Sequence, residues 1–119
     1  MEHLGIEAEL VPRVASGFGG GVGRTGLVCG AISGAVIAAG VRYGTGAADH
    51  DKERAYEISE ALVRSFSARF GATSCRELIG LDLSDPLDSR KARDSGVFVE
   101  RCTQFVEFCA TEIVSKLES

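Results

Sequence analysis

Residues 27–41 read LVCGAISGAVIAAGV, an uninterrupted apolar stretch of 15 residues. This stretch is shorter than the roughly 20 residues that a membrane-spanning helix needs. Because it is apolar on nearly all sides, the pattern predicts a buried central helix rather than an amphipathic surface helix. Small residues recur at every fourth position and leave one face of this helix nearly flat: Gly26, Gly30, Gly34 and Ala38. A flat face allows close packing within the chain or across a symmetric dimer interface, and we expect it to contribute to a homodimer.

A glycine-rich segment, GFGGGVGRTG at residues 17–26, precedes this helix. It is too rich in glycine for a regular helix or strand, so we expect a turn-forming loop that reverses the chain. The letters G-x-G-x-x-G at residues 21–26 match the dinucleotide-binding fingerprint, but that motif requires a preceding strand, which the sequence does not predict. Thr25 is expected to cap the central helix. Anion binding through Arg24 and Thr25 at this helix start is a weaker alternative.

The rest of the sequence also predicts helices. Apolar residues at helical spacing indicate a short helix in residues 7–16, a long one in 51–70 ended by Gly71, and a final one in 99–117. Ser74-x-x-Glu77 is a capping box before a short helix, and Pro86 begins a small polar helix. No run of alternating β-branched residues predicts a strand. We therefore expect residues 1–119 to form a single all-α domain, a compact bundle of four to six helices with the glycine-rich loop before a buried central helix.

Composition excludes several classes of function. The 119 residues can form one hydrophobic core without stabilisation by metal or disulfides. With 17 acidic and 13 scattered basic residues, the net charge is −4, so neither a nucleic-acid partner nor membrane insertion is expected. The first ten residues, MEHLGIEAEL, do not resemble an export signal, which predicts a cytoplasmic protein with reduced thiols.

The four cysteines are the main chemical feature. Cys29 and Cys75 lie at predicted helix starts, with Arg24 and Arg76 respectively close in sequence, and such surroundings lower a thiol pKa. Cys102 and Cys109 are seven residues apart, so they share a helix face with Val106 between them but lie about 10.5 Å apart along the axis, too far for a mutual disulfide. Cys109 is interpreted as a core residue, whereas for Cys102 a core role and a functional role stay open.

The blocks GFGGGVGRTGLVCGAISGAVIAAGVRYG and CRELIGLDL, followed by a cysteine in the final helix, resemble a family of redox-active proteins named for its C…GCAxxG…C…C pattern. The resemblance implies a small helical protein with a cysteine cluster and a redox or metal-related role. By position, Cys29, Cys75 and Cys102 match three cysteines of the pattern. The family's first cysteine lies in an N-terminal helix ahead of the glycine loop, and this sequence lacks it, beginning at what resembles the end of that helix.

Two hypotheses follow. In the first, Cys29, Cys75 and Cys102 converge between helices in a thiol-based redox or metal-binding site, with a redox partner protein. Soft thiolates there would hold an iron–sulfur cluster, zinc or copper(I), or else undergo disulfide exchange. In the second, the chain is a non-catalytic structural or interaction module whose thiols are core residues and whose small-residue helix face forms a homodimer.

Overall fold

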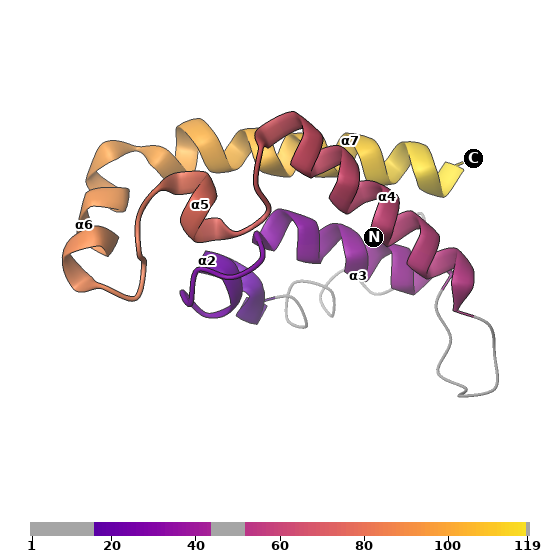
Figure 1. Cartoon of the computed structure of the whole chain (residues 1–119), viewed down its shortest axis with the longest axis horizontal. Coiled ribbons are helices and arrows are strands. Elements are labelled where there is room, and N and C mark those ends of the chain that lie inside the picture. Colours follow the sequence, from indigo (N-terminus) through magenta and orange to yellow (C-terminus); the bar gives the residue numbers. More distant parts are fainter. Residues whose placement is uncertain (1–15, 44–51, 119) are drawn as a thin grey trace.

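The computed structural model describes residues 16–43 and 52–118, and the helix expected in residues 7–16 lies outside them except for Ser16. The described residues form helices and a single isolated β-bridge, which confirms the all-α fold. Figure 1 shows their arrangement. In chain order the elements are η2 (Ser16–Phe18), α2 (Gly19–Val22), α3 (Gly30–Tyr43), α4 (Glu53–Phe70), α5 (Cys75–Ile79), α6 (Pro86–Ser95), the π-helical turn η3 (Phe98–Cys102) and α7 (Thr103–Glu118).

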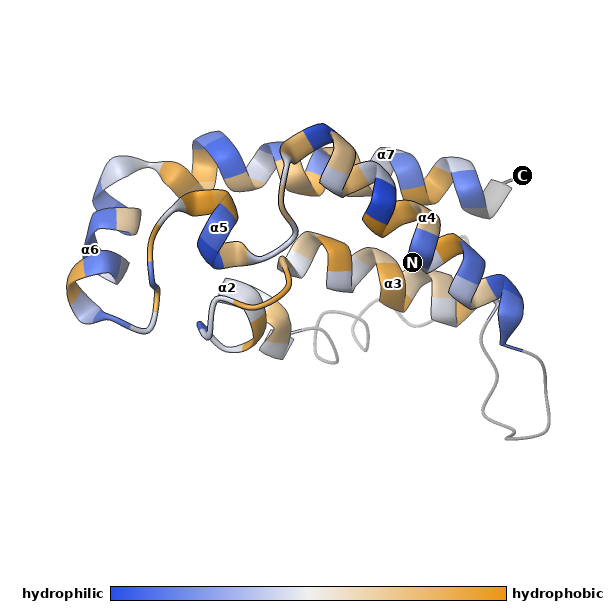
Figure 2. Cartoon of the chain, in the orientation of Figure 1, coloured by the Kyte–Doolittle hydropathy of each residue, from blue (hydrophilic) through white to orange (hydrophobic). Residues whose placement is uncertain are grey.

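Helix α3 packs against both α4 and α7, and these three helices enclose the main core. Ile32 of α3 and Leu62 of α4 are fully buried in this core, and four phenylalanine rings join α4 to α7 with centroids 4.8–6.0 Å apart. In Figure 2, α3 carries almost no hydrophilic residue, whereas α6 is mostly hydrophilic. The short elements α2, α5 and α6 lie on the left in Figure 1, away from the C-terminal end of α7.

Local signals place most helix ends correctly. Gly71, Gly80 and Gly96 each follow the last residue of a helix and have φ between 72 and 83°, the left-handed conformation that glycine adopts without steric cost. Ser74 caps α5, since its side chain accepts a hydrogen bond from the Glu77 N–H, and Pro86 occupies the first position of α6. These interactions join residues close in sequence, which is why the sequence predicts them.

The start of α3 differs from the prediction. The carbonyl of Cys29 accepts hydrogen bonds from the N–H groups of Ile32 and Ser33, so Cys29 is the N-cap and the helix begins at Gly30. Thr25 does not cap it, because its hydroxyl contacts the carbonyls of Gly21 and Val22 at 2.7 Å instead. Backbone pairing before Cys29 delays the helix, as described below.

The final helix also departs from a regular pattern. Its first turn, η3, is π-helical, a form that is rare and often found at functional sites. Phe105, Cys109 and Ile113 are buried, but Val106 is 56% exposed, so it does not belong to the buried stripe. Successive side chains on an α-helix point about 100° apart, so Val106 does not point in the same direction as the buried Phe105. Val106 instead lines a groove between α3 and α7. None of the described helices is long and apolar enough to cross a membrane.

Candidate thiol site

The glycine-rich segment folds into a left-handed turn that includes Gly20, Gly21 and Val22 of α2, so this short element is not a regular α-helix. Five consecutive residues, Gly20 to Arg24, have φ between 60 and 69°. Glycine adopts this conformation freely, but Val22 and Arg24 pay a steric cost on the order of 1–2 kcal/mol each. Backbone hydrogen bonds from Gly23 to Gly17 (2.9 Å) and from Leu27 to Gly21 (2.9 Å) hold the turn closed. A costly conformation held by its surroundings is typical of functional segments.

This turn places Gly21 directly against Cys75. A Cβ atom built on Gly21 would lie 2.7 Å from the Cβ of Cys75 and 2.6 Å from the backbone nitrogen of Leu27. Real Cβ atoms do not approach other atoms so closely, so only glycine fits at this position. The left-handed turn therefore forms one wall around Cys75.

A short backbone pairing brings the starts of α3 and α5 together. Val28 and Ser74 form an isolated antiparallel bridge, in which the Cys29 N–H donates to the Thr73 carbonyl at 2.8 Å and the Cys75 N–H donates to the Leu27 carbonyl at 2.6 Å. Cys29 and Cys75 each directly follow a bridge residue, so their side chains leave the bridge on the same side. Diagonal neighbours across such a pair have Cα atoms about 7–8 Å apart.

Three of the four cysteines line one cavity. Cys29, Cys75 and Cys102, from the cap of α3, the first residue of α5 and the last residue of η3, share a cavity of about 420 Å³. The side chain of Cys29 is buried, whereas those of Cys75 and Cys102 are partly exposed, and none of the three is in a disulfide. The structure thus brings together the three residues that the sequence singled out as redox candidates.

Burial and the charges of neighbouring thiols change the pKa of Cys75 and of Cys102. Burial raises the pKa of Cys75 above its usual range, and the negative charges of Cys102 and Cys29 raise it further. Burial and the charge of Cys29 also raise the pKa of Cys102, while the nearby Arg101 lowers it. The expectation that a helix start and an arginine lower the pKa of Cys75 was wrong, because loss of solvation opposes the thiolate more strongly. The guanidinium of Arg76 instead donates to the Thr25 carbonyl at 3.3 Å.

Cys109 belongs to the core, as expected. It is 2% exposed, and burial, together with the charges of Cys29 and Glu112, raises its pKa to about 12. A thiol with so high a pKa is protonated at neutral pH and is a poor nucleophile.

The sequence also suggested that the three cysteines bind a metal. Within the residues that the structure describes, no group of three or more histidine, cysteine, aspartate or glutamate side chains is arranged to hold a metal ion. Metal binding by Cys29, Cys75 and Cys102 stays a prediction. An iron–sulfur cluster is usually held by four thiolates, and three described thiols line this cavity.

Arg24 and Thr25 are the candidate anion-binding residues. Arg24 ends the left-handed turn and Thr25 follows it, so neither lies at the start of α3. Arg24 lines a neighbouring cavity of about 340 Å³, which shares Gly20, Leu83 and Phe98 with the thiol cavity. The Thr25 hydroxyl contacts backbone carbonyls of the turn. Anion binding by these two residues stays a prediction.

A family model described as "Putative redox-active protein (C_GCAxxG_C_C)" matches residues 1–117. The chain belongs to this family. Membership in the C_GCAxxG_C_C family confirms the resemblance seen in the sequence and supports a redox role in the general sense of the family's description. No curated protein and no solved structure matches the chain.

Sequence reasoning missed several parts of this C_GCAxxG_C_C site. The bridge between Val28 and Ser74 involves one residue pair, so it leaves no alternating pattern in the sequence. The apolar side chains around the thiols, Phe18, Leu83 and Phe98, come from three separate segments. The sequence did indicate the glycine turn, because glycines are concentrated around Gly21. It did not indicate the bridge or the apolar side chains.

Proposed function

We propose that this chain is a two-electron thiol redox protein whose reactive thiols are Cys29, Cys75 and Cys102. The observation that carries the proposal is their convergence, from three separate elements, on one cavity. Two thiols that share a cavity can lose two protons and two electrons to an oxidant and form an internal disulfide. The general redox role of the family supports the same conclusion.

We assign the attacking role to Cys29. It caps a helix of 14 residues, and the N-terminal end of a helix carries partial positive charge that favours a nearby anion. The charge of ionised Cys29 raises the pKa of both Cys75 and Cys102, so these two thiols stay protonated when Cys29 is a thiolate. The cavity then holds one nucleophile next to two protonated partners.

Cys75 is the partner thiol in this proposal. Its position diagonally across the Val28–Ser74 bridge puts the two Cα atoms at the edge of the roughly 7 Å limit for a disulfide. A small shift of the first turn of α5 would close the remaining gap. Cys102, in the π-helical turn, can then attack the Cys29–Cys75 disulfide and move the bond within the cavity by exchange.

The test is a redox titration of the native chain with 2-mercaptoethanol and 2-hydroxyethyl disulfide, a small uncharged couple, followed by non-reducing peptide mass mapping. We expect an intramolecular disulfide between Cys29 and Cys75 with a two-electron dependence on the ratio of the couple. Cys29→Ser should abolish it, and Cys109→Ala should leave it intact. Four reduced thiols at every ratio, or equal loss in both variants, would overturn the proposal.

A further inference from the structure

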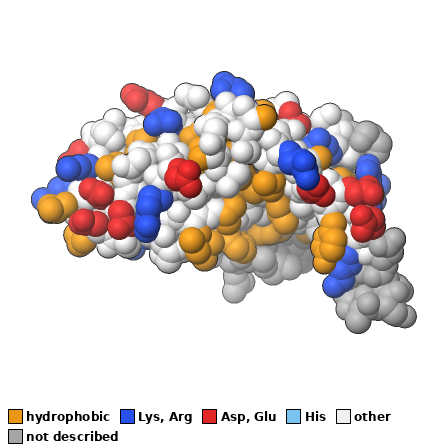
Figure 3. Space-filling model, viewed as in Figure 1, with side chains coloured by type: hydrophobic (Ala, Val, Ile, Leu, Met, Phe, Trp, Pro, Cys, Tyr) orange, Lys and Arg blue, Asp and Glu red, His pale blue; other side chains and the backbone are white. Residues whose placement is uncertain are grey.

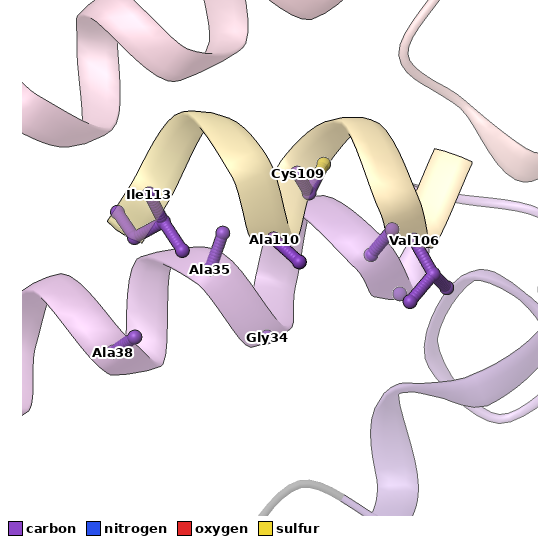
Figure 4. A pocket seen from close by; sticks show the side chains of 9 residues that line it. Gly34, Ala35, Ala38, Val106, Cys109, Ala110 and Ile113 are labelled. Carbon is purple, nitrogen blue, oxygen red and sulfur yellow. The ribbon is translucent and has the colours of Figure 1, made fainter. Parts of the chain in front are cut away.

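The thiol cavity continues into a groove between α3 and α7. Both hollows are lined by Gly30, Ala31 and Val106, so they meet at these residues. The groove has a volume of about 340 Å³ and runs past Gly34 toward Ile113. Figure 4 shows that its labelled side chains come from the two facing helices. One continuous surface therefore leads from the middle of the bundle to the three thiols.

Small residues on α3 keep this groove open. A Cβ atom built on Gly34 would meet no atom within 4 Å, and Ala35 and Ala38 add only a methyl group each. The volumes of groove and cavity lie within the range of small-molecule binding sites, about 300–1,000 Å³. The space beside the thiols is therefore large enough for a small organic molecule.

The lining of both hollows is apolar and uncharged. Among the described residues that line them, none is an acid, a lysine or an arginine, and Ser16 is the single hydroxyl-bearing residue. Charged side chains lie elsewhere, more densely toward the two ends of the molecule, while hydrophobic atoms gather near the first turns of α3 (Figure 3). Cys29 lines the apolar cavity although it is nine-tenths buried, with 9% of its surface exposed. A charged substrate would lose its hydration in the α3–α7 groove without gaining a partner there.

We propose that the oxidant of the thiol site is an uncharged, apolar organic hydroperoxide, whose hydrocarbon part lies in the α3–α7 groove and whose peroxide group reaches Cys29. This inference rests on the proposed redox function of the three thiols. It adds the class of substrate, which the apolar lining and the continuity of the two hollows support.

The reaction balances within the cavity. The Cys29 thiolate attacks the terminal peroxide oxygen, so that an S–O bond forms, the O–O bond breaks and an alkoxide leaves. A protonated thiol, Cys75 or Cys102, donates a proton to the alkoxide, which departs as an alcohol. Its thiolate then attacks the sulfenic sulfur of Cys29, forming a disulfide and releasing the oxygen as water after uptake of a proton. One hydroperoxide and two thiols thus become one alcohol, one water and one disulfide.

Two leucine substitutions in α3 test the role of the groove. Gly34→Leu fills the groove, whereas Gly40→Leu lies on the same helix, in equally open space, but lines neither hollow. Both replace a helix-interior glycine, so both should favour the helix similarly. The single-turnover rate of thiol loss is measured with cumene hydroperoxide and, separately, with hydrogen peroxide.

We expect cumene hydroperoxide to oxidise the native chain at least about tenfold faster than hydrogen peroxide, as the burial of roughly two methylene groups would produce. Gly34→Leu should lose this preference and keep its rate with hydrogen peroxide, and Gly40→Leu should behave as the native chain. Equal rates with both peroxides in the native chain, or the same preference in Gly34→Leu, would overturn the inference while leaving the thiol function standing. Oxidation by neither peroxide would overturn the inference and count against the proposed function.

Sedimentation velocity on the same samples tests the other occupant of the groove. A monomeric native chain supports a small-molecule site. A native dimer that Gly34→Leu converts to a monomer would show that a second copy covers the groove, and the hydroperoxide proposal would then be wrong.

Discussion

Gly21 and Cys75 are in direct backbone-to-side-chain contact, so close that a Cβ atom on Gly21 would lie 2.7 Å from the Cβ of Cys75. The contact joins the left-handed glycine turn to the start of α5, two segments more than 50 residues apart in sequence. It explains why the turn is built from glycine at this point, and it makes the position of Cys75 depend on the turn.

Gly21→Ala should therefore destabilise the chain and displace Cys75. The new methyl group would overlap Cys75 and Leu27, and alanine is unfavourable at a φ of 69°. Together these costs amount to about 2–4 kcal/mol in the free energy of unfolding. Gly23→Ala is the matched control, because Gly23 has a φ of 60° but no atom within 4 Å of its Cβ position, so it should cost only ~1–2 kcal/mol. Denaturant unfolding measures the free energy of unfolding of both variants. An equal loss of stability in the two would contradict the close contact between Gly21 and Cys75.

Ser74→Ala should weaken the start of α5. The Ser74 side chain accepts a hydrogen bond from the Glu77 N–H, and loss of such a cap costs about 1 kcal/mol. Because Cys75 is the first residue of α5, its alkylation by iodoacetamide should become faster as this turn opens more often. Ser67→Ala, an exposed position within α4, should change neither stability nor alkylation. An unchanged alkylation rate of Cys75 in Ser74→Ala would show that the Ser74 cap does not control the reactivity of this thiol.

Cys29→Ser should lower the pKa of Cys75 and of Cys102. The negative charge of Cys29 raises both values, and a serine hydroxyl stays neutral in this pH range. The pH dependence of alkylation at each cysteine, followed by peptide mass analysis, should therefore move to lower pH. Cys109→Ala is the control, since Cys109 does not contribute to either shift. A curve that stays in place in Cys29→Ser would show that the thiols do not influence one another.

Cys109 should make the chain less stable at alkaline pH. Its pKa rises from 9.0 to about 12 on folding, so between these values the unfolded chain loses a proton that the folded chain retains. The contribution is complete below about pH 9 and is lost as the pH rises toward 12, at ~1.4 kcal/mol per pH unit. Denaturant unfolding of Cys109→Ala between pH 8 and 11 should show a shallower decline than the native chain. Parallel declines would argue against a buried, protonated thiol.

Local signals were sufficient for most of the helices. Ser74, Pro86 and the glycines at 71, 80 and 96 mark helix ends through hydrogen bonds and backbone preferences within a few residues, so the sequence alone predicted them. The exposure of Val106 was not predicted, because the apolar character of a side chain does not reveal that the surface beside it is an open groove.

The sequence by itself determined the all-α fold, the family and the identity of the three candidate thiols, since each is carried by residue type and spacing along the chain. Only the tertiary structure decided that these thiols share a cavity. Their convergence depends on the bridge between Val28 and Ser74 and on the fit of Gly21 against Cys75, both contacts between distant segments. The tertiary structure also decided the direction of the pKa of Cys75, because solvation and the charges of other thiols depend on what folding places around the sulfur.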